Sequence, residues 1–416
     1  MLIPVRQHLP RRALPDVRAA VLAEMASSGL ADRLAPGSSV AVAVGSRGIS
    51  NIAAIVRAVV DYWTSHGMRP FIVPAMGSHG SGTPEGQASV LSHFGIDAET
   101  MGCPIISSFD VVSCGRSDLG IEVFAARDAW NSDGIFVVSR VKWHTSFAGR
   151  TESGTSKMLA IGLGKVAGAR SVHGHARTHG MEKCVRSVAA HLLATGKVLG
   201  ALGILEDAWH DTAKVAALPA ERFIAGEEEL LALVKTWMAR IPLPVDVLIV
   251  DEMGKNISGT GMDLKIVNRG VQGQYNPWPD AVKIERIMVR DLTPLSYGSA
   301  VGIGVADVVH DRLVEKIDVT PGRLNAVVSG SLALVRTPLH CPSDRECFEL
   351  VAATVGRFDI ADVRIGWIRN TLELGAMAFS ENMADEIAAL PGLEIAGPPF
   401  EMAFDTEGNL GGLPCF

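Results

Sequence analysis

Three histidine-containing segments are candidates for chemistry, because imidazole transfers protons near neutral pH and binds transition metals in its neutral form. His79 lies in Gly77-Ser78-His79-Gly80, directly after an apolar run, where small neighbours leave its ring accessible. His144 also follows an apolar run. Each could act as an acid or base or bind a metal, and each could instead be a loop residue that hydrogen-bonds to the backbone.

The third segment holds His173, His175 and His179. If the segment is helical, His175 and His179 share one face, because they stand at positions i and i+4. The H-E-x-x-H pattern of zinc proteases is absent. We interpret the cluster as containing at least one ligand of a metal or small molecule, and surface histidines in a loop are the alternative.

Lysines are the next candidates. Lys157 and Lys165 flank the apolar segment 158–164. Partial burial there would lower the pKa of Lys157 and make a neutral, nucleophilic amine more available. The segment before Lys157 lacks the Walker pattern of phosphate loops. Lys255 lies in the glycine-rich loop Gly254–Gly261, which could hold an anion or form a simple turn.

The elements that must position these residues alternate between strands and helices. Ser39–Val44 is predicted to be a buried strand that ends at a glycine loop and leads into a helix. Pro70–Val73 is the next strand, and Thr83 with Pro84 begins another helix after the His79 loop. This alternation predicts parallel strands covered by helices, with ligands bound beyond the carboxyl ends of the strands.

The rest of the chain continues the pattern. The segment Ile241-Pro242-Leu243-Pro244 is the best candidate for a hinge. We therefore expect two α/β domains, residues 1–241 and 242–416, with mixed, largely parallel sheets and an active site in the cleft between them. Further predicted strands include Ile105–Val112, Gly134–Val141, Val245–Val250 and Ala326–Val328, and further predicted helices include Met181–Ala194 and Val301–Val314.

Composition restricts the classes of function. The chain has 416 residues and a formal charge of −7 without a marked basic run, which argues against nucleic-acid binding. No apolar stretch is long enough for a membrane span, and the first residues lack the apolar core of a signal peptide. The six cysteines contain no C-x-x-C pair, which favours free thiols in a cytoplasmic protein.

Taken together, the order and spacing of these segments resemble the lactate racemase family, whose enzymes use a nickel-pincer nucleotide. The resemblance rests on a Gly-x-His loop after an early strand, then a strand followed by His144, then Lys157 and His173, and it is specific over about residues 40–180. It implies a nickel-dependent isomerase that racemises or epimerises a 2-hydroxy acid by hydride transfer to and from the cofactor. It also implies accessory proteins that make the cofactor.

The resemblance assigns a role to each candidate. Lys157 would hold the nickel-pincer nucleotide covalently, and His173 would be the nickel ligand. His79 and His144 would be the opposed acid and base groups. The remaining assignments are Gly77 and Ser46 to the cofactor and Arg47 and Lys255 to the substrate, with Lys265 competing for the role of Lys255.

Elementary chemistry explains why two histidines are needed. Removing the α-proton of a 2-hydroxycarboxylate gives an unstable carbanion, whereas hydride removal gives a stable 2-keto acid. One histidine accepts the hydroxyl proton and the other returns a proton from the opposite side, so both should titrate near neutral pH. Two alternatives stay open: a zinc-dependent hydrolase that uses the His173–His179 cluster, and a non-catalytic protein that binds the nickel cofactor.

Overall fold

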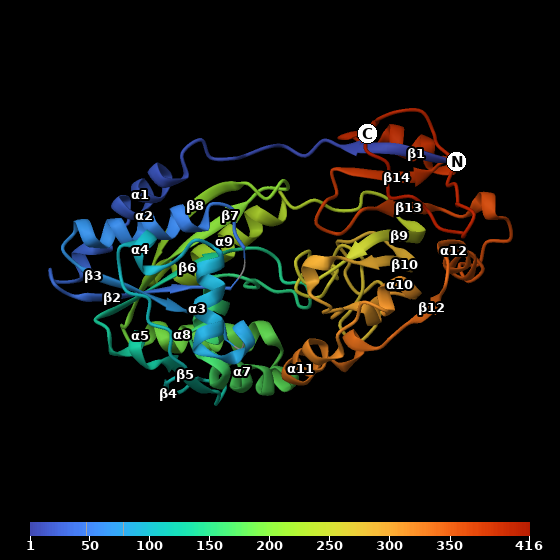
Figure 1. Cartoon of the computed structure of the whole chain (residues 1–416). Coiled ribbons are helices and arrows are strands. Elements are labelled where there is room, and N and C mark those ends of the chain that lie inside the picture. Colours follow the sequence, from blue (N-terminus) through green and yellow to red (C-terminus); the bar gives the residue numbers. More distant parts are fainter. Residues whose placement is uncertain (47, 78) are drawn as a thin grey trace. The chain divides into compact units, whose positions relative to one another are not determined.

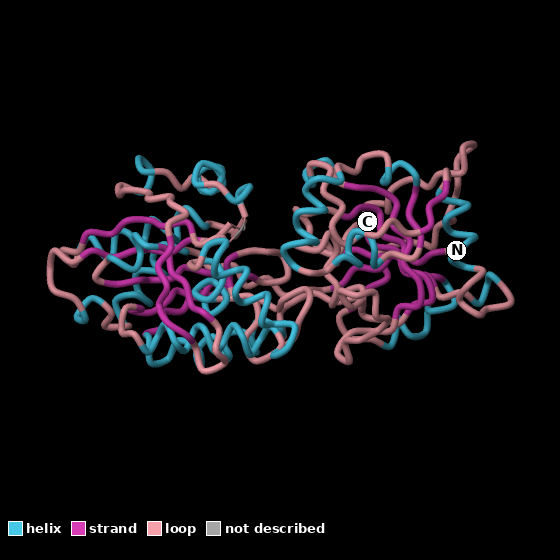
Figure 2. Tube along the Cα trace, turned by 90° about the horizontal axis from the view of Figure 1, so that it is seen from below, coloured by secondary structure: helices cyan, strands magenta, loops and turns pink. Residues whose placement is uncertain are grey.

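The computed structural model of the chain describes residues 1–46, 48–77 and 79–416. These residues form two compact units (Figures 1 and 2). The first, here called the N-terminal unit, is Pro10–Met238, and the second, the C-terminal unit, joins Met1–Leu9 to Ala239–Phe416. Both units combine helices with large, mainly parallel sheets, which confirms the predicted α/β class.

The N-terminal unit is built on a five-stranded sheet with the order β3-β2-β6-β7-β8. Neighbouring strands are parallel except for the last pair, β7 and β8. The predicted strand Ser39–Val44 is observed with the same bounds as β2. The other strands are β3 (Arg69–Pro74), β6 (Gly134–Arg140), β7 (Val198–Glu206) and β8 (Thr212–Pro219).

Strand β2 shows why this sheet is buried on both faces. Its side chains alternate between two hydrophobic clusters, because successive residues of a strand point to opposite sides. Val40, Val42 and Val44 pack in the cluster with α2 (Ile52–Ser65), whereas Ala41 and Ala43 belong to the cluster with α8 (Met181–Ala194). Small and β-branched residues without a polar face therefore suit this central position.

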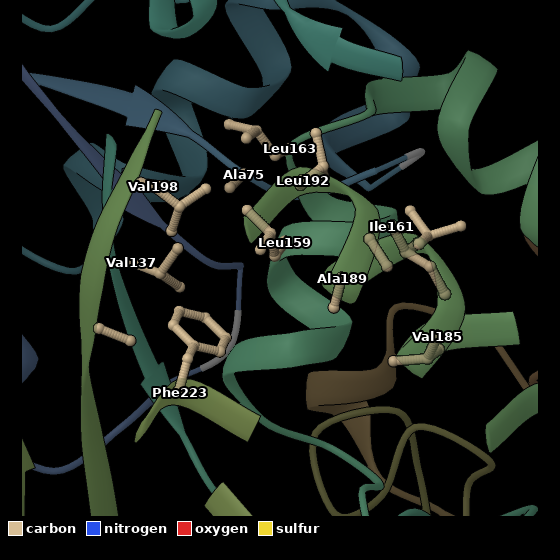
Figure 3. Packing of buried hydrophobic residues seen from close by; sticks show 14 of the residues in the cluster. Ala75, Val137, Leu159, Ile161, Leu163, Val185, Ala189, Leu192, Val198 and Phe223 are labelled. Atoms are coloured by element: carbon tan, nitrogen blue, oxygen red, sulfur yellow. The ribbon is translucent and has the colours of Figure 1, made fainter. Parts of the chain in front are cut away.

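The cluster that contains Ala41 and Ala43 also includes residues of β6, β7, α8 and α9 (Phe223–Lys235). Figure 3 shows Val137 of β6 beside Phe223, the first residue of α9, and Val198 of β7 on the other side of Val137. Ala189 and Leu192 of α8 lie in the same cluster. The remaining helices of this unit are α1 (Val17–Ser27), α3 (Pro84–His93), α4 (Ala98–Met101), α5 (Arg127–Asn131), α6 (Thr155–Lys157) and α7 (Lys165–His179), and β4 (Val111–Arg116) pairs with β5 (Glu122–Ala126).

The C-terminal unit contains an eight-stranded sheet with the order β12-β11-β10-β9-β13-β14-β1-β15. The strands from β12 to β13 are parallel, and those from β14 onward pair in antiparallel fashion. Their bounds are β9 (Val245–Met253), β10 (Ile284–Leu292), β11 (Val308–His310), β12 (Leu339–Cys341), β13 (Ile365–Ile368), β14 (Ala376–Ser380) and β15 (Leu393–Ile395). The helices are α10 (Asp311–Val314), α11 (Val319–Ser329), α12 (Asp344–Ala352) and α13 (Ala384–Ala389).

The first nine residues differ from the predicted division at residue 241. Strand β1 (Leu2–Gln7) inserts between β14 and β15, with Leu2 opposite Ser380 and Val5 opposite Ile395. Buried apolar side chains on this strand favour the insertion, since Leu2, Ile3 and Val5 are almost fully covered. The amino terminus therefore belongs to the C-terminal unit, and the chain crosses between the units twice.

Two predicted elements of the C-terminal unit are wrong. Residues 301–314, predicted as one helix, form a 3-10 turn at Ile303–Val305, strand β11 and the short helix α10. Gly302 has φ +103°, and a Cβ there would lie 1.7 Å from the carbonyl oxygen of Thr260, so a regular helix cannot pass through it. Residues 326–328, predicted as a strand, lie inside α11, whose N-terminus is capped by Asp318.

The strand predicted at Ile105–Val112 is also mostly absent as a regular element. Strand β4 begins only at Val111, and Ile105 forms an isolated bridge to Ile72. Across the described ranges of the chain, the helices are all too short or too polar to cross a membrane.

Candidate active site

The candidate site lies at one edge of the five-stranded sheet. Strands β3, β2 and β6 are neighbours and parallel, so their carboxyl ends meet at the same edge. Ser46 follows β2, His79 follows β3 and His144 follows β6. Two strand spacings separate β3 from β6, which is about 10 Å. The two histidines therefore emerge on either side of β2.

The His79 loop has a tightly constrained backbone. Gly77 has φ +58°, and its N–H donates to the carbonyl of Gly162 at 3.1 Å. The N–H of His79 donates to Met76 at 3.1 Å. Helix α3 then begins as predicted, with the Thr83 hydroxyl accepting from Gly86 at 3.1 Å.

Ser46 contacts His79 directly. The Ser46 hydroxyl and Nδ1 of His79 form a short hydrogen bond. This contact orients the imidazole, a role that the sequence analysis did not assign to Ser46. Arg47, the predicted substrate-binding arginine, lies outside the described residues.

His144 lies in a closed loop after β6. The backbones of Lys142 and Ser153 exchange two hydrogen bonds, of 2.9 and 3.2 Å, at the base of this loop. Nδ1 of His144 accepts from the backbone N–H of Ser146 at 3.1 Å, and Phe147 stacks on the ring at 4.2 Å. Because a backbone N–H can only donate, Nδ1 is an acceptor, and the neutral ring carries its proton on Nε2.

A fully buried carboxylate anchors the His144 loop. Glu152 accepts from the backbone N–H of His144 at 2.6 Å and from that of Gly149 at 3.3 Å. The carboxylate also pairs with Lys235 of α9, whose Nζ lies 2.6 Å away. One glutamate thus fixes both the loop and its position against a helix.

Lys157 ends the short helix α6 and leads into a π-helix, η3 (Met158–Gly162). The start of α6 is fixed by Glu227 of α9, a buried carboxyl group that accepts from the backbone N–H of Ser156 at 2.8 Å and from the hydroxyl of Thr155 at 3.0 Å. Burial raises the pKa of Glu227. π-Helical turns occur often at functional sites, because the extra residue re-aims neighbouring side chains.

Helix η3 packs against the loops that follow β2 and β3. A Cβ on Gly162 would lie 2.5 Å from the carbonyl oxygen of Ala75, and one on Gly45 would lie 2.5 Å from Cε of Met158. Figure 3 shows Leu159 and Ile161 of η3 in the apolar cluster that includes residues of α8. The segment that begins with Lys157 is therefore held close to the loops of Ser46 and His79.

His173 lies on α7 and is half-buried. Its pKa is lowered from the usual value, first by burial and then by the positive charge of Lys157. Both residues lie on the successive helical segments that run from α6 through η3 to α7. The lowered pKa keeps His173 neutral at neutral pH, which is the form that binds metals.

His175 and His179 have a different environment from His173. Nδ1 of His175 hydrogen-bonds to the carbonyl of Ser171 at 2.9 Å, and the rings of His175 and His179 stack at 6.5 Å. No group of three or more His, Cys, Asp or Glu side chains is arranged to hold a metal ion in the part of the chain that the structure describes. The histidine cluster therefore lacks the third protein ligand that a zinc hydrolase site requires.

Lys255 and Lys265 belong to the C-terminal unit, in the segment after β9. The Lys255 Nζ donates to the carbonyl of Gly259 at 2.7 Å within its own glycine-rich loop. The Lys265 Nζ lies 5.2 Å from the ring centre of Trp278.

Sequence reasoning missed the two buried glutamates, Glu152 and Glu227. A signal for Glu227 was present, because it falls on the apolar stripe of its helix, four residues after Phe223 and three or four before Leu230 and Leu231. A carboxylate on such a stripe needs a buried partner. Glu152 carries no comparable local signal.

Comparisons with known proteins agree with this architecture. No family model and no curated protein matches the chain. The solved structure of the lactate racemase apoprotein from Thermoanaerobacterium thermosaccharolyticum is similar, with a TM-score of 0.52 and 11% sequence identity, over 89% of this chain and 99% of that chain. A crystal structure of O-ureido-L-serine synthase shares 13% identity over 86% of this chain and 78% of that chain, but its TM-score of 0.15 carries no argument. The chain has an α/β fold of the lactate racemase type.

Proposed function

We propose that the chain is an isomerase that racemises or epimerises a 2-hydroxy acid with a nickel-pincer nucleotide. The observation that carries the proposal is that Ser46, His79 and His144 follow three adjacent parallel strands, with the helical segment after Lys157 packed against the ends of two of them. The charge of Lys157 also lowers the pKa of His173. The lactate racemase-like fold supports it, as does the arrangement of these residues at the carboxyl edge of a parallel sheet.

The residues present fit this cofactor. Lys157 would attach it covalently, and His173 would complete the coordination of nickel. The described side chains form no three-ligand metal cluster, so a metal held by His173 needs donors that a cofactor brings with it. When bound, the nickel-pincer nucleotide supplies a reversible acceptor of hydride.

Lys157 suits the covalent role better than Lys165, the other lysine that flanks η3. Lys165 is only 1% exposed, and its amine donates to the carbonyl of Pro74 at 2.6 Å and to Gln87 at 3.0 Å. Lys157 is half-buried, and its charge lowers the pKa of His173. Covalent attachment requires an amine that a cofactor can reach, and Lys165 is covered.

His79 and His144 move protons in this proposal. The neutral His144 carries its proton on Nε2 and can donate it to an alkoxide that forms from a ketone. His79 is oriented by Ser46 and accepts the hydroxyl proton from the opposite side. The roles exchange in the reverse direction, as they must for a racemase or an epimerase. Arg47 and Lys255 remain proposed ligands of the substrate carboxylate, through charge-assisted hydrogen bonds.

The test is mass spectrometry of the intact protein after co-expression with the enzymes that make the cofactor. We expect an added mass localised to Lys157, and one nickel per chain by elemental analysis. Lys157→Arg should abolish the adduct, because a guanidinium cannot form the amine linkage, whereas Lys183→Arg, at an exposed lysine of α8, should retain it. A wild-type chain without adduct or nickel refutes the proposal.

A loaded protein would then be assayed against chiral 2-hydroxy acids and sugar acids. Inversion of one of them, with loss of activity in His79→Gln and His144→Gln, is the expected result. An adduct without turnover of any acid would instead support a non-catalytic cofactor-binding protein.

A further inference from the structure

Lys165 is an unusual residue, because it is fully covered and lies in a left-handed backbone conformation. Its side chain is 1% exposed and its φ is +54°. Lysine is almost never buried without specific partners, and a non-glycine residue at positive φ is a strained choice. Both features indicate that specific contacts hold Lys165 at this position.

The partners of Lys165 lie in the two elements that border the His79 loop. Its Nζ donates to the carbonyl of Pro74, the last residue of β3, at 2.6 Å. It also donates to Oε1 of Gln87 on α3 at 3.0 Å. The aromatic ring of Phe109 lies 5.5 Å from the ammonium. Burial lowers the pKa of Lys165 to about 8.

Gln87 connects Lys165 to the His79 loop. The glutamine is fully buried, and its Nε2 donates to the carbonyl of Gly77 at 3.0 Å and to that of His79 at 3.2 Å. An ammonium group can only donate, so Lys165 must bond to the side-chain oxygen of Gln87. This contact fixes the orientation of the Gln87 amide. The two N–H groups of the amide then point at the loop carbonyls.

The loop also packs closely against α3. A Cβ on Gly80 would lie 2.8 Å from the backbone nitrogen of Gln87, and one on Gly86 would lie 2.1 Å from the carbonyl oxygen of Gly80. Such contacts leave the loop backbone little room to move independently of Gln87.

Lys165 also connects two parts of the candidate site. Its backbone begins α7, which carries His173, while its side chain holds the end of β3 and, through Gln87, the backbone of His79. We propose that Lys165 and Gln87 are positioning residues that fix the His79 loop relative to helix α7. The positioning itself stands on these contacts, and its effect on catalysis rests on the proposed function.

Two substitutions test this. Gln87→Glu keeps an acceptor for Lys165 and removes the two donors to the loop, with little change of volume. Lys165→Met removes the ammonium and keeps an unbranched side chain. The matched control is Lys197→Met, because Lys197 also donates to a backbone carbonyl, that of Ser132 at 3.0 Å, but at the opposite edge of the same sheet.

The first measurement is hydrogen exchange on the protein without cofactor. We expect amides of residues 75–83 to exchange about tenfold faster or more in Gln87→Glu and Lys165→Met, because each variant removes hydrogen bonds that hold this loop. The control should match the wild type in this region. Unchanged exchange in Gln87→Glu refutes the positioning role, and this variant decides the matter if Lys165→Met does not fold.

The second measurement uses the loaded protein. The variants should retain the mass adduct on Lys157 and lose about a hundredfold in kcat with little change in KM, since misplacing a catalytic group by about 1 Å has an effect of that size. If the loop loosens but the wild type carries no adduct, the proposed function fails while the positioning role stands. If the adduct forms and kcat is unchanged despite a loosened loop, His79 does not act in catalysis.

Discussion

Replacing Glu152 by alanine should loosen the loop that carries His144. The carboxylate is fully buried and accepts from two backbone N–H groups, of His144 and Gly149, and from Lys235. Removing one partner of a buried ion pair costs about 3–5 kcal/mol. Because the Lys235 side chain is 31% exposed, water will solvate its charge in part, so we expect the lower end of this range, about 3 kcal/mol.

The assay is urea unfolding of Glu152→Ala and of a control, Glu221→Ala. Glu221 pairs with Arg33 at the surface, where the glutamate side chain is 62% exposed, and removing such a pair costs about 1 kcal/mol or less. Hydrogen exchange should show faster exchange of residues 144–150 in the first variant only. Equal, small losses of stability in the two variants would refute the view that Glu152 anchors the loop.

Three further predictions follow from single contacts. Lys157→Met should raise the pKa of His173 in the cofactor-free protein, measured by NMR of the imidazole, but not to its usual value, because burial is the larger cause; an unmoved titration would contradict this effect of the Lys157 charge. The pKa of Lys165 falls from 10.5 to about 8 on folding, so the unfolded chain binds more protons between these values and stability should rise with pH there. Lys165→Met should remove up to about 3 kcal/mol of that rise in unfolding experiments, and an identical pH profile would exclude a lowered pKa of Lys165. Gly154→Ala should lower stability by about 1–3 kcal/mol in thermal or urea unfolding, because the new Cβ would lie 2.0 Å from Oε1 of Glu227; a variant as stable as the wild type would contradict this packing.

The strands and helices of the N-terminal unit could be predicted because their sequences carry local periodicity. Strand β2 and helix α8 have the predicted bounds, and Thr83 caps α3 as expected. Such signals depend on residues a few positions apart. The residues 301–314 show the limit, because a short apolar run fits a helix until a distant contact, here between Gly302 and Thr260, forbids it.

The pairing of β1 could not be predicted for a related reason. Its partners, β14 and β15, lie more than 360 residues further along the chain, and the alternation of its own residues does not identify them. Of the candidate site, the histidines and lysines could be found from their neighbours in sequence. The partners that hold them could not, since Glu227 meets the Lys157 segment only after α9 has folded against it.

Each proposed catalytic segment is held by a different buried ionisable group. Glu152 anchors the loop of His144, Glu227 fixes the helix that ends in Lys157, and Lys165 holds the loop of His79. Burying a charge costs several kcal/mol of desolvation, which an apolar core residue would avoid. What a buried charge provides is several directional hydrogen bonds at one side chain: Glu152 accepts from two backbone N–H groups, Glu227 accepts from a backbone N–H and a hydroxyl, and Lys165 donates to a carbonyl and to an amide oxygen.

Three such groups beneath one edge of one sheet therefore indicate that backbone positions at this edge are maintained at the expense of stability. Functional sites characteristically depart from the most stable arrangement in this way. Oε1 of Glu227 has no hydrogen-bond partner among the described residues, which adds to that cost. Substituting this glutamate by glutamine should therefore separate the two properties: the stability of the fold changes little, because burial already raises the pKa of this carboxyl group, while hydrogen bonds to a neutral amide oxygen are weaker than those to a carboxylate and fix the position of Lys157 less well. An adduct that forms at the wild-type rate in Glu227→Gln would show that the helix, without the carboxylate, is sufficient to place the lysine.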